Sequence, residues 1–186
     1  MPQEAAAPER LHGLPPVVSP GTAVLVLGSF PGVASLRARQ YYGHPQNHFW
    51  RILQALWPQH PLPGGAHSYA LRCQWLLDRG LGVWDVYASC LRQGSLDAAI
   101  RDPVVNDFAL LRAHCPGLRA IAHNGAESFR HAPAVLHSLQ AGGPGHGAAP
   151  PIESIKLPST SPANASWSFE RKLAAWADLM ARHGML

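Results

Sequence analysis

The feature that most constrains the fold is a short apolar run that stops at a glycine-rich turn. Residues 23–27 read Ala-Val-Leu-Val-Leu, and Gly28-Ser29-Phe30-Pro31-Gly32 follows at once. An apolar run of this length, without polar alternation, is typical of a strand buried on both faces of a parallel sheet. Parallel strands need crossover connections, usually helices. The run therefore predicts an α/β domain with this turn at the carboxyl end of its first strand.

Strand and helix patterns alternate along the rest of the chain. Further strands are predicted over 81–87, 118–122 and 152–157, and helices over 47–57, 69–79, 104–114, 126–140 and 166–183, the fourth of them breaking at Pro133. Residues 97–101 predict a short turn, and the Gly-, Pro- and Ala-rich residues 141–151 predict a loop. The alternation predicts a layered α/β domain with a short, mainly parallel four-stranded sheet.

Length and composition fit one domain. The chain has 186 residues, of which 47% are hydrophobic and 14% charged, and this allows a substantial core. Residues 1–20, rich in Pro and Ala, predict a flexible arm, and residues 21–186 a single domain. No apolar run reaches the ~18 residues that span a bilayer, and the acidic N-terminus lacks the apolar core of a secretory signal. We expect a cytoplasmic monomer without a membrane partner.

Cysteine and histidine spacing argues against a metal site. The three cysteines lack CxxC spacing, so neither a disulfide framework nor a cysteine zinc site is predicted. His44 and His48 stand four residues apart, but Pro45 opposes a helix that would bring them to one face. The net charge of +4 fits a polyanionic partner without requiring one. We therefore expect no metal and no cofactor.

Polar and glycine residues gather where the predicted strands end. These positions hold residues 28–32, Asp85-Val86-Tyr87, Asn124-Gly125 and Ser159-Thr160-Ser161-Pro162. In an open parallel sheet, ligands bind in the crevice at the carboxyl ends of the strands. The sequence therefore predicts one site at this edge of the sheet.

The first turn continues into an aromatic segment, Tyr41-Tyr42-Gly43-His44-Pro45-Gln46-Asn47-His48-Phe49-Trp50. Two adjacent tyrosines offer a flat surface on which a base can stack. The amide of Asn47 can hold a water molecule or a base edge, yet an N-cap explains an Asn there equally well. Phe49 and Trp50 are expected in the core because large aromatic residues are usually buried.

A second segment lies between the last predicted strand and the last predicted helix. It reads Leu157-Pro158-Ser159-Thr160-Ser161-Pro162-Ala163-Asn164. Hydroxyl groups and free backbone N–H groups at the start of a helix suit a phosphate. An ordinary Ser/Thr-rich capping loop has the same composition, so the segment alone leaves both interpretations open.

Together the two segments resemble the signature motifs of the uracil-DNA glycosylase superfamily. The first is similar to Gly-x-x-Pro-Gly followed by His-Pro-x-Asn-x-Phe-Trp, a form shared with the mismatch-specific uracil/thymine branch. Residues 28–32, 41–42 and 157–164 are most similar to the hypoxanthine-DNA glycosylase branch, as are residues 84–90, 94–97 and 124–125. The resemblance runs from residue 22 to the C-terminus and implies a three-layer α/β sandwich around the short parallel sheet.

The resemblance implies roles for residues of the base-binding side. Asn47 takes the position that the hypoxanthine branch uses for catalysis, and Tyr42 the position where the superfamily stacks an aromatic ring on the flipped base. Phe30 stands where the mismatch-specific branch has a catalytic Asn, so that mechanism does not transfer directly, and we place Phe30 among the base contacts. Asp85 and Asn124 are candidates for reading the base edge, although Asp85 is explained equally well as a structural acceptor.

The resemblance also implies which residues touch the DNA backbone. Contacts are expected from a set of small polar residues and one alanine: Ser29, Ser159, Thr160, Ser161, Ala163 and Asn164. Related enzymes push a side chain into the gap left by the flipped base. Ala163 is small, so we expect Asn164 or a neighbour to fill that gap.

The reaction implied by the resemblance is hydrolysis of the N-glycosidic bond of a deaminated base, foremost hypoxanthine, in damaged DNA after base flipping. No lysine stands in either motif, so a Schiff-base lyase step is not predicted. One alternative is a mismatch-specific uracil/thymine glycosylase. Another is a non-catalytic module that binds damaged DNA, which Phe30 makes conceivable. A nucleotide-binding α/β enzyme is disfavoured because neither GxxxxGK[ST] nor GxGxxG occurs.

Overall fold

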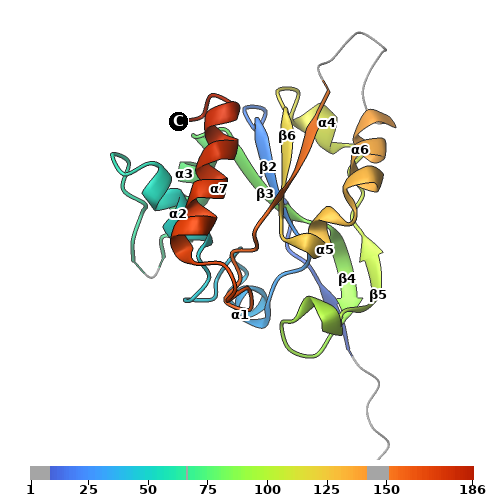
Figure 1. The fold of residues 1–186 in the computed structure, drawn as a ribbon. Coiled ribbons are helices and arrows are strands. Elements are labelled where there is room, and N and C mark those ends of the chain that lie inside the picture. Colours follow the sequence, from blue (N-terminus) through green and yellow to red (C-terminus); the bar gives the residue numbers. More distant parts are fainter. Residues whose placement is uncertain (1–8, 66, 142–150) are drawn as a thin grey trace, which may run out of the picture.

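A four-stranded parallel sheet lies at the centre of the protein (Figure 1). The computed structural model describes residues 9–65, 67–141 and 151–186. The sheet has the order β3-β2-β6-β7, with parallel pairing throughout. Its strands are β2 (Val24–Gly28), β3 (Leu81–Asp85), β6 (Ala120–Asn124) and β7 (Glu153–Leu157). All five residues of β2 are buried, so the predicted central strand and the four-stranded parallel sheet are confirmed.

The two faces of β2 point into two separate cores. Val24 and Val26 pack in one cluster with Trp176, whereas Leu25 and Leu27 pack in the other. The first core lies under three helices, α2 (Phe49–Leu56), α3 (Tyr69–Leu77) and α7 (Phe169–Arg182). Three other helices cover the second core on the opposite face of the sheet, as Figure 1 shows: α4 (Leu111–His114), α5 (Ala126–Phe129) and α6 (Ala132–Ala141). Because side chains alternate along a strand, a strand that is apolar throughout needs a layer on each side. The predicted three-layer sandwich is confirmed.

A second, antiparallel sheet was not predicted. It has the order β1-β4-β5, with β1 (Arg10–His12), β4 (Tyr87–Leu91) and β5 (Arg101–Val105). The predicted strand 81–87 is in fact divided, because the chain leaves the parallel sheet after Asp85 and starts β4 at Tyr87. The predicted helix 104–114 is wrong except for its last turn, α4. Val104 and Val105 are β-branched, and Pro103 is tolerated because β5 is an edge strand.

The N-terminal segment is more ordered than predicted. β1 pairs with β4, and the N–H and C=O of Val17 both bond to Val83 at 2.9 Å. The expectation of a flexible arm is therefore wrong for residues 10–20, because this extended segment supplies the edge of one sheet and bridges to the other. Residues 1–8 of the expected arm lie outside the described residues.

The helices follow the predicted order with shifted ends. The predicted helix 126–140 is divided into α5 and α6, with Pro133 in the first turn of α6, where proline is tolerated. Ser168 caps α7 by accepting a hydrogen bond from the N–H of Arg171. Helix α1 (Val33–Ala38) was missed, since six residues are too short for a periodic pattern. A 3₁₀ turn, η1 (Asp97–Ala99), lies inside the predicted turn 97–101. Within the described residues, the helices are too short or too polar to cross a membrane.

Candidate active site

The carboxyl ends of the central strands bring the two predicted segments together. β2 leads into residues 29–48, which we call the first loop region, and β7 leads into residues 158–166, which we call the second loop. The N–H of His48 donates to the carbonyl of Thr160 at 3.0 Å. The residues before α2 and the residues before α7 are therefore in direct contact at the edge predicted from the strand ends.

Asn47 holds the start of α2 with one end of its amide. Its Oδ1 accepts the N–H of Phe49 at 3.0 Å, and its own N–H donates to the carbonyl of His44 at 2.9 Å. The N-cap position of α2 is occupied by His48, so the predicted N-cap role of Asn47 is wrong by one residue, although its oxygen still accepts the first N–H of the helix. This contact uses only the oxygen of the amide. Among the described residues, Nδ2 has no hydrogen-bond partner. An amide whose oxygen is fixed in this way presents its NH₂ group as a directed donor.

Tyr42 is held in an unusual backbone conformation beside this contact. Its φ of 55° lies in the left-handed region, which is costly for a residue other than glycine. Its ring stacks on Phe49 with the ring centroids 3.9 Å apart and the planes 24° apart, and its hydroxyl accepts from Nδ2 of Asn124 at 3.1 Å. Burial raises the pKa of Tyr42, so the phenol stays neutral. The two contacts fix the ring in place.

Asn124 links the first loop region to the second loop. Its Nδ2 donates to the hydroxyl of Tyr42 at 3.1 Å and to Oγ1 of Thr160 at 2.9 Å, while its Oδ1 accepts the N–H of Thr160 at 2.9 Å. Both amide hydrogens are thereby used. The structure gives Asn124 a positioning role and leaves no amide hydrogen for the predicted contact with a base edge.

The carboxyl group of Asp85 is buried, and one of its oxygen atoms lacks a hydrogen-bond partner among the described residues. The residue is 5% exposed, and Oδ2 finds no partner in the described part of the chain. Burial, together with the charge of Asp97, raises the pKa of Asp85 to about 7, although Arg92 opposes the shift. The backbone carbonyl of Asp85 accepts a hydrogen bond from the side chain of Asn106 at 2.8 Å. A buried, unsatisfied carboxyl group at a ligand-binding edge favours a functional role over a structural one.

Gly28 makes room for this carboxyl group. A Cβ placed on Gly28 would lie 2.4 Å from Oδ1 of Asp85 and 3.6 Å from the hydroxyl of Tyr42. The absence of a side chain here therefore brings the end of β2, the end of β3 and the stacked tyrosine into contact.

Phe30 and Ser29 are engaged within the protein. Phe30 is 6% exposed and packs in the second core, with the guanidinium of Arg92 5.0 Å from its ring centroid. The ring is therefore largely covered within the protein, and its contact with a base stays a prediction. The hydroxyl of Ser29 donates to Oδ1 of Asp97 at 2.6 Å, so its contact with DNA stays a prediction.

The residues that hold the first loop region from outside were not predicted. Ser95 accepts the N–H of Val33 at 3.0 Å, and the buried Arg92 donates to the carbonyl of Pro31. A signal was present, because Gly94-Ser95-Leu96-Asp97 is a small polar run between two strands. Its partner was not predictable, since the contact spans more than sixty residues of sequence.

The second loop is folded upon itself by its own side chains. Oγ of Ser159 accepts the N–H of Ser161 at 3.2 Å, and Oγ of Ser161 accepts the N–H of Ala163 at 3.2 Å. Asn164 donates from Nδ2 to the carbonyl of Ser159 at 3.1 Å and accepts from Ser166 at 3.1 Å. The loop is thus preformed, and Asn164 must release two bonds before it can enter a gap in DNA. The predicted DNA contacts of these residues stay predictions.

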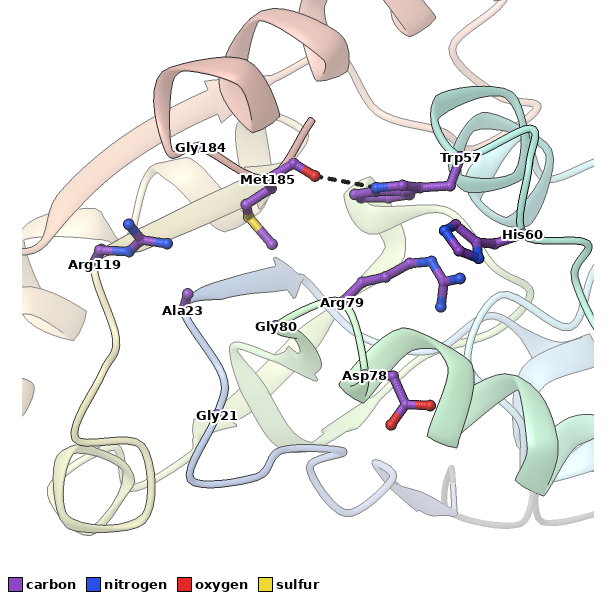
Figure 2. Close-up of a pocket in the computed structure, with 10 residues that line it drawn as sticks. All are labelled: Gly21, Ala23, Trp57, His60, Asp78, Arg79, Gly80, Arg119, Gly184 and Met185. Carbon is purple, nitrogen blue, oxygen red and sulfur yellow. Dashed lines mark hydrogen bonds between the residues drawn. The ribbon is translucent and has the colours of Figure 1, made fainter.

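A cavity of about 670 Å³ lies at the opposite edge of the sheet, where the strands begin. Figure 2 shows its lining, which includes Arg119 and Trp57, and the bond from the indole N–H of Trp57 to the carbonyl of Met185 at 3.1 Å. None of the predicted site residues lines it. Within the described ranges, no three His, Cys, Asp or Glu side chains form a group that could hold a metal ion. The carboxyl edge is therefore the candidate active site.

The fold is similar to that of a known structure. A solution NMR structure from Methanosarcina acetivorans, identified as a candidate uracil DNA glycosylase, superimposes with a TM-score of 0.76 at 32% identity, covering 95% of this chain and 99% of the other. The sequence model of the Uracil DNA glycosylase superfamily matches residues 15–180. The chain belongs to the uracil DNA glycosylase superfamily.

Two curated relatives are similar to this chain over most of its length. Both are named hypoxanthine DNA glycosylase. The protein from Methanosarcina barkeri is 34% identical over 173 residues, which cover 93% of this chain and 99% of the relative. The protein from Methanosarcina acetivorans is 34% identical over 163 residues, which cover 87% of this chain and 92% of the relative. The predicted resemblance to this superfamily is confirmed.

Proposed function

We propose that the protein is a monofunctional DNA glycosylase that releases hypoxanthine from damaged DNA by hydrolysing the N-glycosidic bond of deoxyinosine. Asn47 carries this proposal, because its oxygen is fixed by a helix while its NH₂ group is left free beside the second loop. The names of the two curated relatives support the choice of base. We propose a monomer that acts in the cytoplasm, a compartment that fits the three free thiols.

The flipped base stacks on Tyr42. One face of this ring is covered by Phe49, so the base takes the other face. Aromatic stacking on a base contributes about 1–3 kcal/mol and tolerates any base, so it supports binding but not selection. Flipping costs a few kcal/mol and costs least for a poorly paired base.

Asp85 distinguishes hypoxanthine from adenine, the base from which it forms. Its pKa of about 7 keeps a large share of the carboxyl group protonated near neutral pH. A protonated carboxyl group donates one hydrogen bond and accepts another. Hypoxanthine presents O6 as an acceptor and N1–H as a donor, the pair that deamination of adenine creates. The O–H of Asp85 donates to O6 and so stabilises the negative charge that the departing base acquires.

Uracil is a second candidate substrate, because its O4 and N3–H present the same pair to Asp85. The site holds both bases by this edge, and the larger purine stacks more of its area on Tyr42. We therefore place hypoxanthine first and uracil second.

Asn47 acts on the bond that breaks. As the C1′–N9 bond lengthens, the sugar becomes positively charged and the base negatively charged. The NH₂ group of Asn47 donates to the departing purine or holds the water molecule that attacks C1′. An amide is too weak a base to remove a proton from water, so positioning and electrostatics supply the rate enhancement.

A substrate panel and two variants test the proposal. Duplexes with one hypoxanthine, uracil, xanthine or mismatched thymine are incubated with excess protein, and abasic sites are detected by alkaline cleavage. We expect the fastest cleavage at hypoxanthine. Asn47→Ser keeps an oxygen that can accept the first N–H of α2, so it should fold and bind DNA normally but lose about 10²–10³-fold in excision rate.

The neighbouring Gln46→Ala is the matched control, because Gln46 is exposed and its amide takes no part in this contact with α2. Excision by Asn47→Ser at the wild-type rate would remove Asn47 from the mechanism. Tight binding of all the lesions without any cleavage by the wild-type protein would instead support a binding module.

A further inference from the structure

Lys172 is a buried lysine behind the second loop. It lies on α7, is 1% exposed, and its ammonium group contacts the carbonyl of Ser161 at 3.5 Å, which is long for a hydrogen bond. The ion pairs in the described part of the chain are formed by Arg130, Arg182 and His183. Within the described part of the chain, Lys172 therefore forms no ion pair with a carboxylate.

Packing does not account for a lysine at this position. Phe169, Lys172, Trp176 and Leu179 share the inward face of α7, since they are spaced by three or four residues. Trp176 and Leu179 are fully buried. A leucine or methionine at position 172 would continue this face without the cost of burying a charge, so the charge itself points to a function.

The second loop lacks any charge of its own. Its residues 158–166 include no basic or acidic side chain. The carbonyl of Ser161, which Lys172 contacts, also accepts the N–H of Asn164 at 3.0 Å and so closes the turn of the loop. Lys172 thus stands behind the part of the loop that is proposed to grip a phosphate.

His48, Arg51 and Glu170 lie near Lys172. Burial, and then the charges of Lys172 and Arg51, lower the pKa of His48, while Glu170 opposes the shift. Arg51 lies over the ring of Phe169 at 4.8 Å. Glu170 is the acidic residue of α7 nearest to this group, and it is exposed. A cationic group that lacks a buried acidic partner attracts an anion from outside.

We propose that Lys172 is a positioning residue for the DNA backbone: its buried charge supplies the attraction for a phosphate that the uncharged second loop lacks, and its contact with Ser161 keeps that loop closed. This inference rests on the proposed function. The negative charge of the phosphate would balance the positive charge of Lys172 across the second loop. This attraction is effective because an interaction between charges is stronger in a poorly solvated site than in water.

The test removes the charge in two ways. Lys172→Gln replaces the ammonium group by a neutral amide on a side chain one bond shorter, and Lys172→Met removes the polar group altogether. Lys156→Met is the control, because Lys156 is the other lysine of the chain and is exposed on β7. Dissociation constants are measured at several salt concentrations with a duplex that carries a tetrahydrofuran abasic-site analogue, and thermal unfolding is followed in parallel.

We expect both Lys172 variants to bind about tenfold more weakly, with the slope of log affinity against log salt reduced by about 0.9, the value for one phosphate. Their melting temperatures should equal or exceed that of the wild type, since the cost of a buried charge has been removed. Lys156→Met should change neither slope nor melting temperature. Because the probe contains no base at the lesion, the result does not depend on which base is excised.

Two outcomes would overturn the inference. In one, folded Lys172→Gln binds with the affinity and salt slope of the wild type. In the other, both variants melt at lower temperatures and lose affinity only in proportion to the unfolded fraction, which would make Lys172 a structural residue. Failure of the proposed function would look different, because the wild-type protein would bind the probe and yet excise no base.

Discussion

The first loop region and the second loop meet at one edge of the sheet, but they use their polar atoms differently. Among the residues that the structure describes, the NH₂ group of Asn47 in the first loop region and the neighbouring Oδ2 of Asp85 have no hydrogen-bond partner. In the second loop, four side-chain bonds close Ser159, Ser161 and Asn164 upon the loop itself. Free polar atoms cost stability, and a preformed cradle costs little on binding. The difference indicates that one region performs chemistry and the other holds a ligand.

The largest expected effect concerns Asp85 and pH. Its pKa of about 7 in the folded state, against 3.8 in the unfolded chain, means that the folded protein keeps a proton that the unfolded chain releases. The contribution of Asp85 to the free energy of unfolding therefore falls as pH rises from about 4 to about 7, by roughly 4 kcal/mol at 1.36 kcal/mol per pKa unit. Burial lowers the pKa of His123 to about 4, which acts in the opposite direction, so the contribution of Asp85 is measured as the difference between the wild type and Asp85→Asn. Asp85→Asn should not show this fall. Denaturant unfolding at pH values on both sides of this range measures it.

The same proton should govern catalysis. Above pH 7 the carboxyl group of Asp85 loses the O–H that donates to the base, so wild-type excision should fall while Asp85→Asn, which keeps a donor, changes little with pH. A parallel pH dependence in both proteins would show that another group titrates. A difference in unfolding free energy between the wild type and Asp85→Asn that stays constant between pH 4 and 7 would contradict the buried state of Asp85.

The next effect tests the space that Gly28 provides. Gly28→Ala would place a methyl group 2.4 Å from Oδ1 of Asp85, so the ends of β2 and β3 must shift. Displacement of about 1 Å at a reacting centre costs about 100-fold in rate. We expect that loss in single-turnover excision, with a moderate loss of stability. Gly64→Ala is the matched control, because a Cβ there meets no atom within 4 Å.

Equal rates for Gly28→Ala and Gly64→Ala would show that the contact of Asp85 with the end of β2 is unimportant for the reaction.

The strands of the central parallel sheet were predicted from the sequence because they are buried. Val24 to Leu27 show no alternation because β2 has a core on each face, and that pattern is visible without a structure. β5 could not be found in this way, because all five of its residues are exposed and its pairing with β4 is a tertiary contact.

In the candidate site, too, some features were predictable from the sequence and others depend on tertiary contacts. Asn47 and Tyr42 were predicted because they stand in a motif, and the structure places both at the predicted edge. The internal bonds of Asn124 were not predictable, since its partners are 82 and 36 residues away. Lys172 could have been noticed, because it interrupts the apolar face of α7.

Asn124 is where the two regions are joined, so its removal should affect both. Asn124→Ala removes three hydrogen bonds, to Tyr42 and Thr160. We expect a loss of about 1–3 kcal/mol in stability and about tenfold in both excision rate and affinity for DNA. Tyr42→Phe removes one of these bonds and keeps the stacked ring, so it should cost less. If Asn124→Ala altered excision alone, the second loop would be independent of Asn124.

The smallest effect is expected inside the second loop. Ser161→Ala removes the acceptor for the N–H of Ala163, one of several bonds that close the loop. A single hydrogen bond of this kind contributes about 0.5–1.5 kcal/mol, so we expect a loss of that size in the free energy of unfolding. Affinity for DNA should fall a few fold, and the excision rate of the bound complex should stay unchanged, because no atom of this loop is proposed to act on the reacting bond. Single-turnover kinetics with saturating protein separate the two quantities. A slower rate at saturation would mean that the second loop also takes part in catalysis, and the contrast between the two regions would then lie in rigidity alone.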